Sequence, residues 1–529
     1  MGGIIVKPNI AISRLRYNLG LSQEQFAERL NVTRRTIQNW ESGISNPDSE
    51  KLILMSREFD ISIDILLNLS SNREKEEHYN KIFPNRDRHT WESYEKELPI
   101  EYKQSVDEGL DIEKYENLFL EVSKMPQGIY KKKMSDVLYD IVNNASVRAN
   151  YIYEEPSDLL GIKALRKIEE QPLNNIDNDK LRSKITGAWY GRIAGCLLGK
   201  PIEGIRTPDL NMLLKESGNY PLHRYILSSD ITDSIIEKSK FNLKKDDRSW
   251  ADRIECAPAD DDTNYTVMAS ILIERHGKNF TPDDVMDIWI NSQPFSAYCT
   301  AERVAWRNYF DGYCPPNTAI YKNPYREWIG AQIRADYFGY INPGNPEAAA
   351  EMAWKDASVS HIKNGIYGEM FVAAMLAGAA VTNNPKQVIK IGLGQIPSTS
   401  RLYEKVSEII NMHDSGVGLD ECYRKIHSVF DENSSHGWCH TISNAMIVVM
   451  ALLYGSDFSD AVGIAVQTGF DTDCNGATVG SVYGMMNGIE SIGEEWTSPI
   501  NKKLKTNIIG KSIYDIDTLI DTTLKHINM

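Results

Sequence analysis

Two groups of aspartates, far apart in the chain, have the residue types and spacing of a metal site. Asp260, Asp261 and Asp262 are consecutive, and Asp471 and Asp473 lie two positions apart in a glycine-rich stretch. Adjacent carboxylates repel one another unless positive charge compensates them, and hard divalent cations bind through several carboxylate and hydroxyl oxygens. The sequence therefore predicts that these five aspartates bind metal, with Mg²⁺ as the first candidate and Mn²⁺ as the second.

The elements that must position these acids are helices, two of which are rich in glycine. The first acid group opens an amphipathic helix that is predicted to close at His276 and Gly277. The second directly precedes a helix with a glycine at every fourth position, and another such helix ends just before Glu203. The two series are Gly476, Gly480, Gly484 and Gly488, and Gly187, Gly191, Gly195 and Gly199. Because each glycine costs a helix about 1 kcal/mol relative to alanine, we expect another backbone to approach these faces closely.

The composition excludes several classes of protein. A chain of 529 residues predicts two or more domains, and a net charge of -15 excludes nucleic-acid or membrane binding along its whole length. The densest apolar run, 445–454, is far shorter than the ~20 residues that cross a bilayer, and no secretory signal is recognisable. Seven cysteines without a C-x-x-C pair favour reduced thiols and a cytoplasmic location.

Zinc is a second metal hypothesis, and it rests on His436, Cys439 and His440. No further ligands follow these three residues at a matching spacing. We therefore interpret them as residues of the core or of the lining of a site.

The N-terminal residues 8–68 have the signals of a small helical module. Ser22 is a predicted N-cap with Gln25 at the spacing of a capping box, Thr33 is predicted to cap a second helix, and Gly43 to end it. The stretch LSQEQFAERLNVTRRTIQNWESGISNPDSEKL resembles the Cro/C1-type helix-turn-helix family. The resemblance implies a small five-helix domain that binds double-stranded DNA, usually as a dimer on two half-sites, so a homodimer is expected.

The resemblance also implies which side chains face the DNA. By position, Arg34, Arg35, Gln38 and Asn39 would contact bases, and Gln23 would contact phosphate. Residues 1–68 hold eight Lys/Arg and eight Asp/Glu, so phosphate attraction has to come from a local arginine face. Binding to protein instead of DNA remains open.

The rest of the chain divides into a spacer and a large domain. We predict a helix-turn-helix domain over 1–70, a charged helical linker over 71–133 and a large domain over 134–529. The linker is predicted because its start, SNREKEEHYNK, is dense in charge and poor in apolar residues.

Several motifs of the large domain occur in the order typical of one family. GAWYGRIAGCLLGKPIEG, DDDTNYT, SHIKNGIYGEMFVAAM, HTISNAMIVVMALLYG and GFDTDCNGATVG resemble the ADP-ribosylglycohydrolase family, including its dinitrogenase reductase-activating glycohydrolase-like members. The resemblance implies an all-α bundle around a two-metal site that holds the five aspartates. It also implies that Glu203 acts at the reacting end and that the substrate meets His361, Asn364, Gly365 and Tyr367.

Three positions depart from the family pattern. Many relatives have threonine or serine in place of Asp260 and threonine in place of Cys474, and a soft sulfur suits Mg²⁺ poorly. The loop 330–334, where we expect Gln332 to contact substrate, differs from the G-N-G-x-x-M-R-like loop of relatives that act on ADP-ribosylated protein. The substrate is therefore less well defined by the sequence than the metal site.

These observations give one main functional hypothesis and two alternatives. The main one is a Mg²⁺-dependent hydrolase that cleaves an N-glycosidic bond to ADP-ribose or a related riboside, with Glu203, Asp261 and Asp471 as catalytic residues and a DNA-binding domain attached. One alternative is a transcription regulator whose hydrolase-like domain senses ADP-ribose or a nucleoside. The other is a hydrolase of nucleosides or other small N-ribosides.

Overall fold

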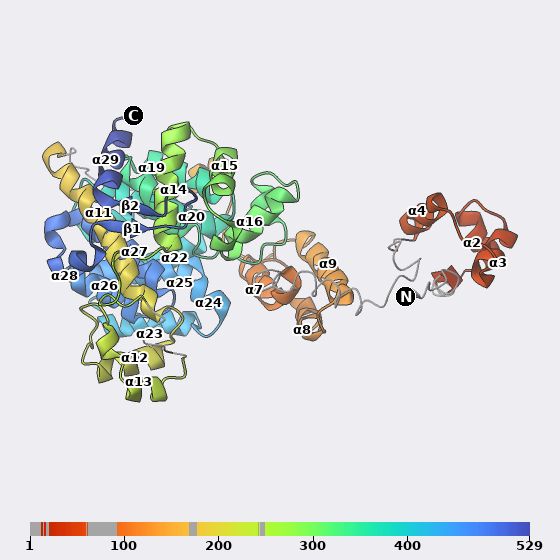
Figure 1. Cartoon of the computed structure of the whole chain (residues 1–529), viewed down its shortest axis with the longest axis horizontal. Coiled ribbons are helices and arrows are strands. Elements are labelled where there is room, and N and C mark those ends of the chain that lie inside the picture. Colours follow the sequence, from red (N-terminus) through yellow and green to blue (C-terminus); the bar gives the residue numbers. More distant parts are fainter. Residues whose placement is uncertain are drawn as a thin grey trace. The chain divides into compact units, whose positions relative to one another are not determined.

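The computed structural model describes residues 12–59 apart from 14, 17, 18 and 20, residue 61, and residues 93–168, 177–241, 243 and 249–529 (Figure 1). These residues belong to two compact units. The smaller unit includes the described part of residues 1–90 together with 124–137, and the larger includes the described residues of 91–123 and 138–529. The boundaries predicted at residues 70 and 133 stay predictions.

The smaller unit contains the predicted helix-turn-helix. The helices of this module are α2 (Gln23–Arg29), α3 (Arg34–Ser42) and α4 (Ser49–Glu58). The capping box of Ser22 and Gln25, the N-cap at Thr33 and the left-handed C-cap at Gly43 are all present, as the sequence predicts. Phe26, Ile37, Trp40 and Met55 form the core between the helices. The remaining parts of the five-helix prediction, 8–11 and 62–68, lie outside the described residues.

Helices also build the larger unit, which confirms the predicted all-α class. Its longer helices, with α9 running across the division between the units, are α7 (Leu98–Asp107), α8 (Glu116–Lys124), α9 (Ile129–Asn143), α10 (Leu159–Leu165), α11 (Asn178–Gly199), α12 (Thr207–Glu216), α13 (Asp233–Lys238), α14 (Asp261–His276), α15 (Pro282–Ser292), α16 (Thr300–Phe310), α19 (Pro346–Ala357), α20 (Lys363–Ala379), α21 (Pro385–Leu393), α22 (Arg401–Asp414), α23 (Leu419–Val429), α25 (Thr441–Tyr454), α26 (Phe458–Gln467), α27 (Thr472–Asn487) and α29 (Ile516–Ile527).

Shorter elements connect these helices. The short α-helices are α17 (Asn317–Ile320), α18 (Asp336–Tyr340), α24 (Ser435–Cys439) and α28 (Glu494–Thr497). The 3₁₀ turns are η2 (Tyr94–Lys96), η3 (Glu113–Tyr115), η4 (Lys200–Ile202), η5 (Ser228–Asp230), η6 (Phe295–Ala297), η7 (Gln332–Arg334), η8 (Ile489–Ser491) and η9 (Ser498–Ile500). Among the described residues, the only strands are β1 (Lys503–Lys505) and β2 (Ile513–Asp515), which pair antiparallel. None of the described helices combines the length and the apolar character that a membrane span needs.

The two glycine-rich helices pack against each other. A Cβ built on Gly191 would lie 2.1 Å from the carbonyl oxygen of Gly480, and one on Gly195 would lie 1.9 Å from that of Gly476. Gly187 meets Gly484 in the same way, so α11 and α27 run antiparallel with their backbones in contact (Figure 1). The predicted close approach of another backbone is confirmed, and each glycine series is the partner of the other.

The remaining core surrounds this pair. Helices α20 and α25 are mostly apolar and almost entirely buried, which is typical of central helices in a large all-α domain. Helix α20 packs on α19, α21 and α27, and α25 packs on α22, α26 and α27. The glycine-rich pair is thus supported by buried apolar helices rather than by loops.

Residues 91–123 differ from the predicted solvent-exposed spacer. The carboxylates of Glu101 and Glu108 on and after α7 are buried and pair with Arg326, at 2.9 and 2.6 Å. Gln104 is also buried and donates to Glu327 Oε2 at 2.6 Å. Glu101 and Glu108 are therefore used in buried ion pairs, which join α7 to the rest of the larger unit. The charge-dense stretch 71–81, on which the linker prediction rests, lies outside the described residues.

Candidate metal centre

The packing of α11 on α27 places Glu203 near the second acid group. Because the two helices are antiparallel, the end of α11 lies beside the start of α27, and Gly199 touches the backbone of Thr472. Thr472 Oγ1 donates to the Gly199 carbonyl at 3.0 Å. The chain then passes through η4 to Glu203, whose carboxylate lies near those of Asp471 and Asp473.

The first acid group is held by one buried arginine of α11. Arg192 is completely buried, and its guanidinium donates to the Asp262 carbonyl at 2.7 and 3.0 Å. It also pairs with Asp262 Oδ1 at 3.2 Å and with Asp336 Oδ2 at 2.7 Å. A single side chain of α11 therefore fixes the start of α14 relative to the glycine-rich pair.

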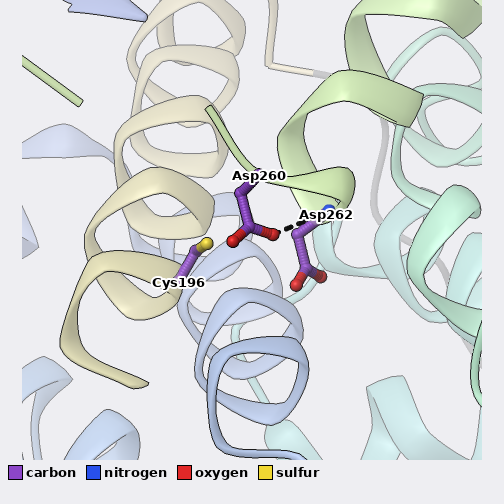
Figure 2. Close-up of side chains that lie close together, drawn as sticks. All are labelled: Cys196, Asp260 and Asp262. Atoms are coloured by element: carbon purple, nitrogen blue, oxygen red, sulfur yellow. Dashed lines mark hydrogen bonds between the residues drawn. The ribbon is translucent and has the colours of Figure 1, made fainter. Parts of the chain in front are cut away.

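Three sets of side chains could each hold a metal ion. In each set the candidate ligand atoms lie within 4.8 Å of one another: Glu203, Asp471 and Asp473; Asp262, Asp473 and Cys474; and Cys196, Asp260 and Asp262. Figure 2 shows the third set, in which the Cys196 thiol of α11 points toward the carboxylates at the start of α14. Four of the five predicted aspartates and Glu203 thus come together, joined by two cysteines.

Asp260 already has a positive partner within the chain. Lys200 Nζ donates to Asp260 Oδ2 at 2.5 Å, and Asp260 Oδ1 accepts from the backbone N–H of Asp262 at 3.0 Å. Burial opposes ionisation of Asp260, but the charge of Lys200 outweighs it and lowers the pKa of this carboxyl. Asp260 is the N-cap of α14 and is neutralised by the chain itself.

The other acids carry an excess of negative charge. Burial and neighbouring carboxylates raise the pKa values of Asp261, Asp262 and Asp471 well above the ordinary range. Burial raises the pKa of Asp473 to about 6, and the charge of Asp473 is the largest cause of the raised pKa of Glu203. Among described residues, only Lys200 and Arg192 form ion pairs with this cluster.

Two unpartnered oxygens show that the cluster fits a cation. Asp262 Oδ2 and Asp473 Oδ1 are buried and find no hydrogen-bond donor among the described residues. A buried carboxylate oxygen without a partner is costly, and a divalent cation is the partner that such clusters usually have. The residues present therefore fit bound divalent cations, while the identity of the ion is open.

The acids differ in their exposure. Asp262, Asp471 and Asp473 are buried, whereas Glu203 and Asp261 are partly exposed. Asp261 belongs to none of the three sets, although the sequence predicts it as a metal ligand. Its metal-binding role stays a prediction, and its exposure leaves it open to a molecule arriving from solvent.

The residues predicted to meet substrate in the segment 361–367 are buried. Asn364 donates to Glu155 and Glu327, at 2.8 Å each, and accepts from the Leu402 N–H. The Tyr367 hydroxyl donates to the Pro156 carbonyl, and a Cβ on Gly365 would lie 2.6 Å from the Arg326 carbonyl. Their polar groups are used inside the protein, so substrate contact by this segment stays a prediction.

Two predicted substrate residues keep one nitrogen without a hydrogen-bond partner among the described residues. His361 is fully buried, accepts or donates at Nδ1 with Ser360 Oγ at 2.8 Å, and leaves Nε2 unpartnered. Gln332 accepts from Thr441 Oγ1 at 3.2 Å and leaves Nε2 unpartnered. Burial lowers the pKa of His361 well below its usual value, so this ring is neutral.

The histidines considered for zinc have other partners. His436 lies 3.0 Å from Asp107 Oδ2 and accepts from the Trp328 indole N–H, while His440 lies 3.7 Å from Glu327. Cys439 Sγ donates weakly to Asp471 Oδ2 at 3.9 Å. None of the metal-binding sets found among the described residues contains a histidine.

The predicted DNA-facing residues lie on the surface of the smaller unit. Arg34, Arg35 and Gln38 of α3 are exposed, and Asn39 is half-buried. Arg34 pairs with Glu24 at 2.7 Å, an exposed pair that DNA phosphate can displace. Gln23 donates to Glu41 Oε2 at 2.8 Å, so its predicted phosphate contact requires this bond to be shared or released.

Sequence reasoning missed several residues of the centre. Arg192, Lys200 and Cys196 were not predicted from the sequence. Arg192 could have been found, because a charged residue among the glycines and apolar residues of a buried helix is unusual. Lys200 directly follows the last glycine of the series. Cys196 gives no signal, because one cysteine among apolar residues is typical of any core.

The fold and the centre define a class: an all-α domain with an acid cluster at the starts of two helices, combined with a helix-turn-helix module. Residues 177–525 match the family model described as ADP-ribosylglycohydrolase, and residues 12–66 match one described as helix-turn-helix. The chain belongs to the ADP-ribosylglycohydrolase family.

Two further proteins are similar to parts of the chain. The HTH-type transcriptional activator BcrR of Enterococcus faecalis is 44% identical over 59 residues, which are 11% of this chain and 29% of that protein. The chain thus spans less than a third of that relative. A solved structure titled ADP-ribosylglycohydrolase-related protein complex is 16% identical with a TM-score of 0.40, covering 66% of this chain and 99% of that one.

Proposed function

We propose that the larger unit hydrolyses the N-glycosidic bond between a ribose, in ADP-ribose or a related riboside, and its leaving group. The observation that carries this proposal is the set Glu203, Asp471 and Asp473 beside the unpartnered oxygens of Asp262 and Asp473. Family membership supports the reaction class. Two Mg²⁺ ions are the proposed cofactor, with Mn²⁺ as the second candidate.

The proposed reaction breaks the bond from the anomeric carbon to the leaving nitrogen, which takes up a proton from solvent, and forms a bond to the oxygen of water. Glu203 is partly exposed at the edge of the acid cluster, so it is the group that can accept a proton from that water. Asp261, also partly exposed, can stabilise the positive charge that develops on the ribose ring. Bound divalent cations would hold the ribose hydroxyls and orient the water.

The remaining residues act by position. Arg192 and Lys200 hold Asp262 and Asp260, so the start of α14 keeps its place next to α27. The contact of Gly199 with Thr472 keeps Glu203 close to Asp473. Both are structural contributions to a site that has to be formed before substrate arrives.

The test is product release by the purified full chain. The substrates are ADP-ribosyl-arginine, ADP-ribosylated protein and free nucleosides, with ADP-ribosyl-serine as the comparison in which the bond is O-glycosidic, each with Mg²⁺ and with EDTA. Metal-dependent release of ADP-ribose is the expected result. Release of a free base from nucleosides would replace the proposed substrate by a small riboside, and binding without any release would leave a sensor.

For the smaller unit we propose binding to double-stranded DNA through α3. Exposed Arg34, Arg35 and Gln38 support this, as does the similarity to a protein named as a transcriptional activator. Arginine and glutamine can each make two hydrogen bonds to one base edge. The combination of this module with the larger unit favours a second role, in which ligand binding or turnover changes the affinity for DNA.

Selection of binding sites from a random DNA pool tests this role. Arg35→Ala and Gln38→Ala are expected to weaken binding to the selected sequence by about 1–3 kcal/mol and to relax its specificity. Arg57→Ala, an exposed arginine of α4, is the control and should bind as the unaltered chain does. Equal loss in all three variants would contradict the assignment to α3.

A further inference from the structure

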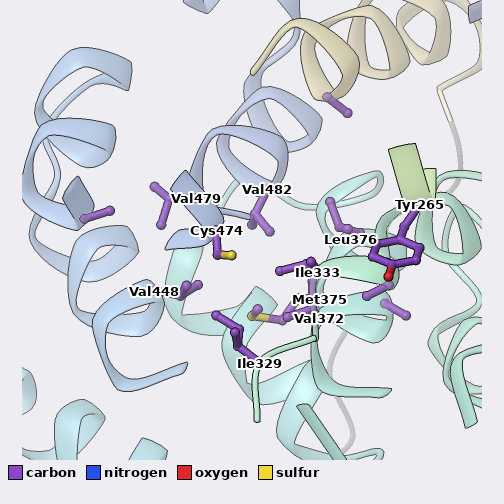
Figure 3. Close-up of a cluster of buried hydrophobic side chains, with 14 of the residues drawn as sticks. Tyr265, Ile329, Ile333, Val372, Met375, Leu376, Val448, Cys474, Val479 and Val482 are labelled. Carbon is purple, nitrogen blue, oxygen red and sulfur yellow. The ribbon is translucent and has the colours of Figure 1, made fainter. Parts of the chain in front are cut away.

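The thiol of Cys474 lies in the first turn of α27, directly after Asp473. It is buried, with an exposed fraction of 6%, and Figure 3 shows it beside the apolar side chains Val482 and Val448. Its sulfur nevertheless lies within 4.8 Å of carboxylate oxygens of Asp262 and Asp473. An ordinary core cysteine has apolar neighbours only, so this thiol lies at a border between core and acid cluster.

The two carboxylates near this thiol are the ones that lack partners. Asp262 Oδ2 and Asp473 Oδ1 have no hydrogen-bond partner among the described residues, although these side chains are 0% and 4% exposed. Asp262 Oδ1 is used by Arg192 at 3.2 Å. The residues that have these unpartnered oxygens, Asp262 and Asp473, belong to the same set of potential ligands as Cys474.

The other thiols near the cluster, Cys196 and Cys439, lie beside carboxylate oxygens that already have hydrogen-bond partners. Cys196 is grouped with Asp260 and Asp262, but both oxygens of Asp260 already accept hydrogen bonds. One comes from Lys200, and the other, drawn in Figure 2, comes from the backbone N–H of Asp262. Cys439 Sγ has Asp471 Oδ2 as its hydrogen-bond acceptor. Cys474 is therefore the thiol for which both neighbouring carboxylates have an unpartnered oxygen, whereas Cys196 has one such neighbour, Asp262.

We propose that Cys474 is a sulfur ligand of the metal centre, so that the centre has two unequal halves. Asp471 and Asp473, with Glu203 beside them, form a half that offers a cation oxygen atoms only, which suits Mg²⁺. Asp262, Asp473 and Cys474 form a half with mixed sulfur and oxygen ligands, which suits a borderline-soft divalent cation such as Co²⁺ or Zn²⁺. Asp473 belongs to both halves and links them.

Binding requires a change of protonation at sulfur. The S–H bond of Cys474 breaks, a bond from sulfur to the cation forms, and the proton leaves to the solvent. No oxidant or reductant takes part. The inference rests on the proposed function only in requiring that the acid cluster binds divalent cations.

Cobalt is the probe, because a bond from thiolate sulfur to Co²⁺ gives charge-transfer absorption in the near ultraviolet that oxygen ligands do not give. The full chain is stripped of metal with EDTA and titrated with Co²⁺, with equilibrium dialysis to count bound ions. The unaltered chain is expected to show the band. Cys474→Thr, which keeps the size and offers an oxygen, is expected to lose it.

Cys196→Ser and Cys439→Ser are the matched controls and should keep the band. Bound cobalt without the band in the unaltered chain, or a band that survives Cys474→Thr, would overturn the proposal. If Cys474→Thr fails to fold, the ¹¹³Cd resonances of the unaltered chain and of the two control variants are compared instead. A chemical shift typical of a sulfur ligand in all three proteins supports the proposal. A chemical shift typical of oxygen ligands only overturns it.

These readouts are independent of turnover. Release of ADP-ribose with Mg²⁺ but no cobalt band would reject the sulfur ligand and leave the proposed hydrolase intact. A cobalt band without release of product from any of the substrates would support the sulfur ligand and reject the proposed hydrolase.

Discussion

At the scale of single residues, Asp473 links the set that contains Glu203 to the set that contains Cys474. It belongs to two of the three potential metal-binding sets, it raises the pKa of Glu203, and it keeps one buried oxygen without a partner among the described residues. A residue with these properties is expected to matter more for binding and reaction than for folding, because its charge is uncompensated until a cation arrives.

Replacement of both α27 acids tests this expectation. Asp471→Asn together with Asp473→Asn keeps the side-chain shapes but removes two charges, and should abolish turnover while the fold is retained. The measurements are product release with Mg²⁺ and the thermal unfolding midpoint by circular dichroism. Asp420→Asn, an exposed acid of α23, is the control. Full activity of the double variant would disprove the assignment.

Arg192 has the opposite character and is expected to matter for stability. Arg192→Met leaves the buried carboxylates of Asp262 and Asp336 without their partner, which should cost about 3–5 kcal/mol of unfolding free energy. Arg182→Met on the same helix removes only an exposed pair with Asp521 and should cost at most about 1 kcal/mol. Denaturant unfolding compares the two, and equal costs would contradict the role given to Arg192.

At the scale of elements, the sequence predicted the helix starts well because their signals are local. Ser22, Thr33 and Asp260 are N-caps in the structure, and Gly43 ends its helix with a positive φ. The glycine series predicted a close approach of backbones, since no local reason favours glycine inside a helix. Which backbone approaches could not be predicted from one helix alone, because it depends on packing between distant segments.

Contacts between distant segments were also the part of the candidate site that the sequence could not predict. Five aspartates were identified from residue type and spacing and Glu203 from the family resemblance, whereas Lys200 was not identified as the partner of Asp260. Residues 91–123 appeared solvent-exposed because charged helices usually are, yet Glu101 and Glu108 are buried against Arg326. A partner that lies more than 200 positions away leaves no periodicity in the sequence.

One glycine substitution tests the packing of α11 on α27. Gly195→Ala would place a methyl group 1.9 Å from the Gly476 carbonyl oxygen, so the helices must separate. We expect a loss of at least about 1–3 kcal/mol in stability and a larger loss of activity, because the end of α11 positions Glu203. Gly418→Ala, where nothing lies within 4 Å of the added methyl group and φ is -74°, is the control. Unchanged stability of Gly195→Ala would contradict the close packing.

At the scale of the whole molecule, cation binding should stabilise the larger unit. The cluster repels itself without a cation, and a ligand that binds only the folded state adds about 2.7 kcal/mol at one hundred times its dissociation constant. Mg²⁺ or Mn²⁺ should therefore raise the main unfolding midpoint in calorimetry, and EDTA should reverse the rise. The Asp471→Asn, Asp473→Asn variant should lack most of it. An equal rise in this variant would indicate that the cations bind elsewhere.

The antiparallel glycine pair also limits how this centre can vary. If α11 shifted along α27 by one or two residues, side chains such as Ala194 or Cys196 would meet a carbonyl oxygen where a glycine now lies. A shift by the full four-residue repeat restores the fit but moves the ends of the helices about 6 Å apart. The separation between Glu203 and the acids of α27 therefore cannot change gradually. The two helices can pack only in registers that differ by a full four-residue repeat, and only one of these registers brings the acids of the centre together.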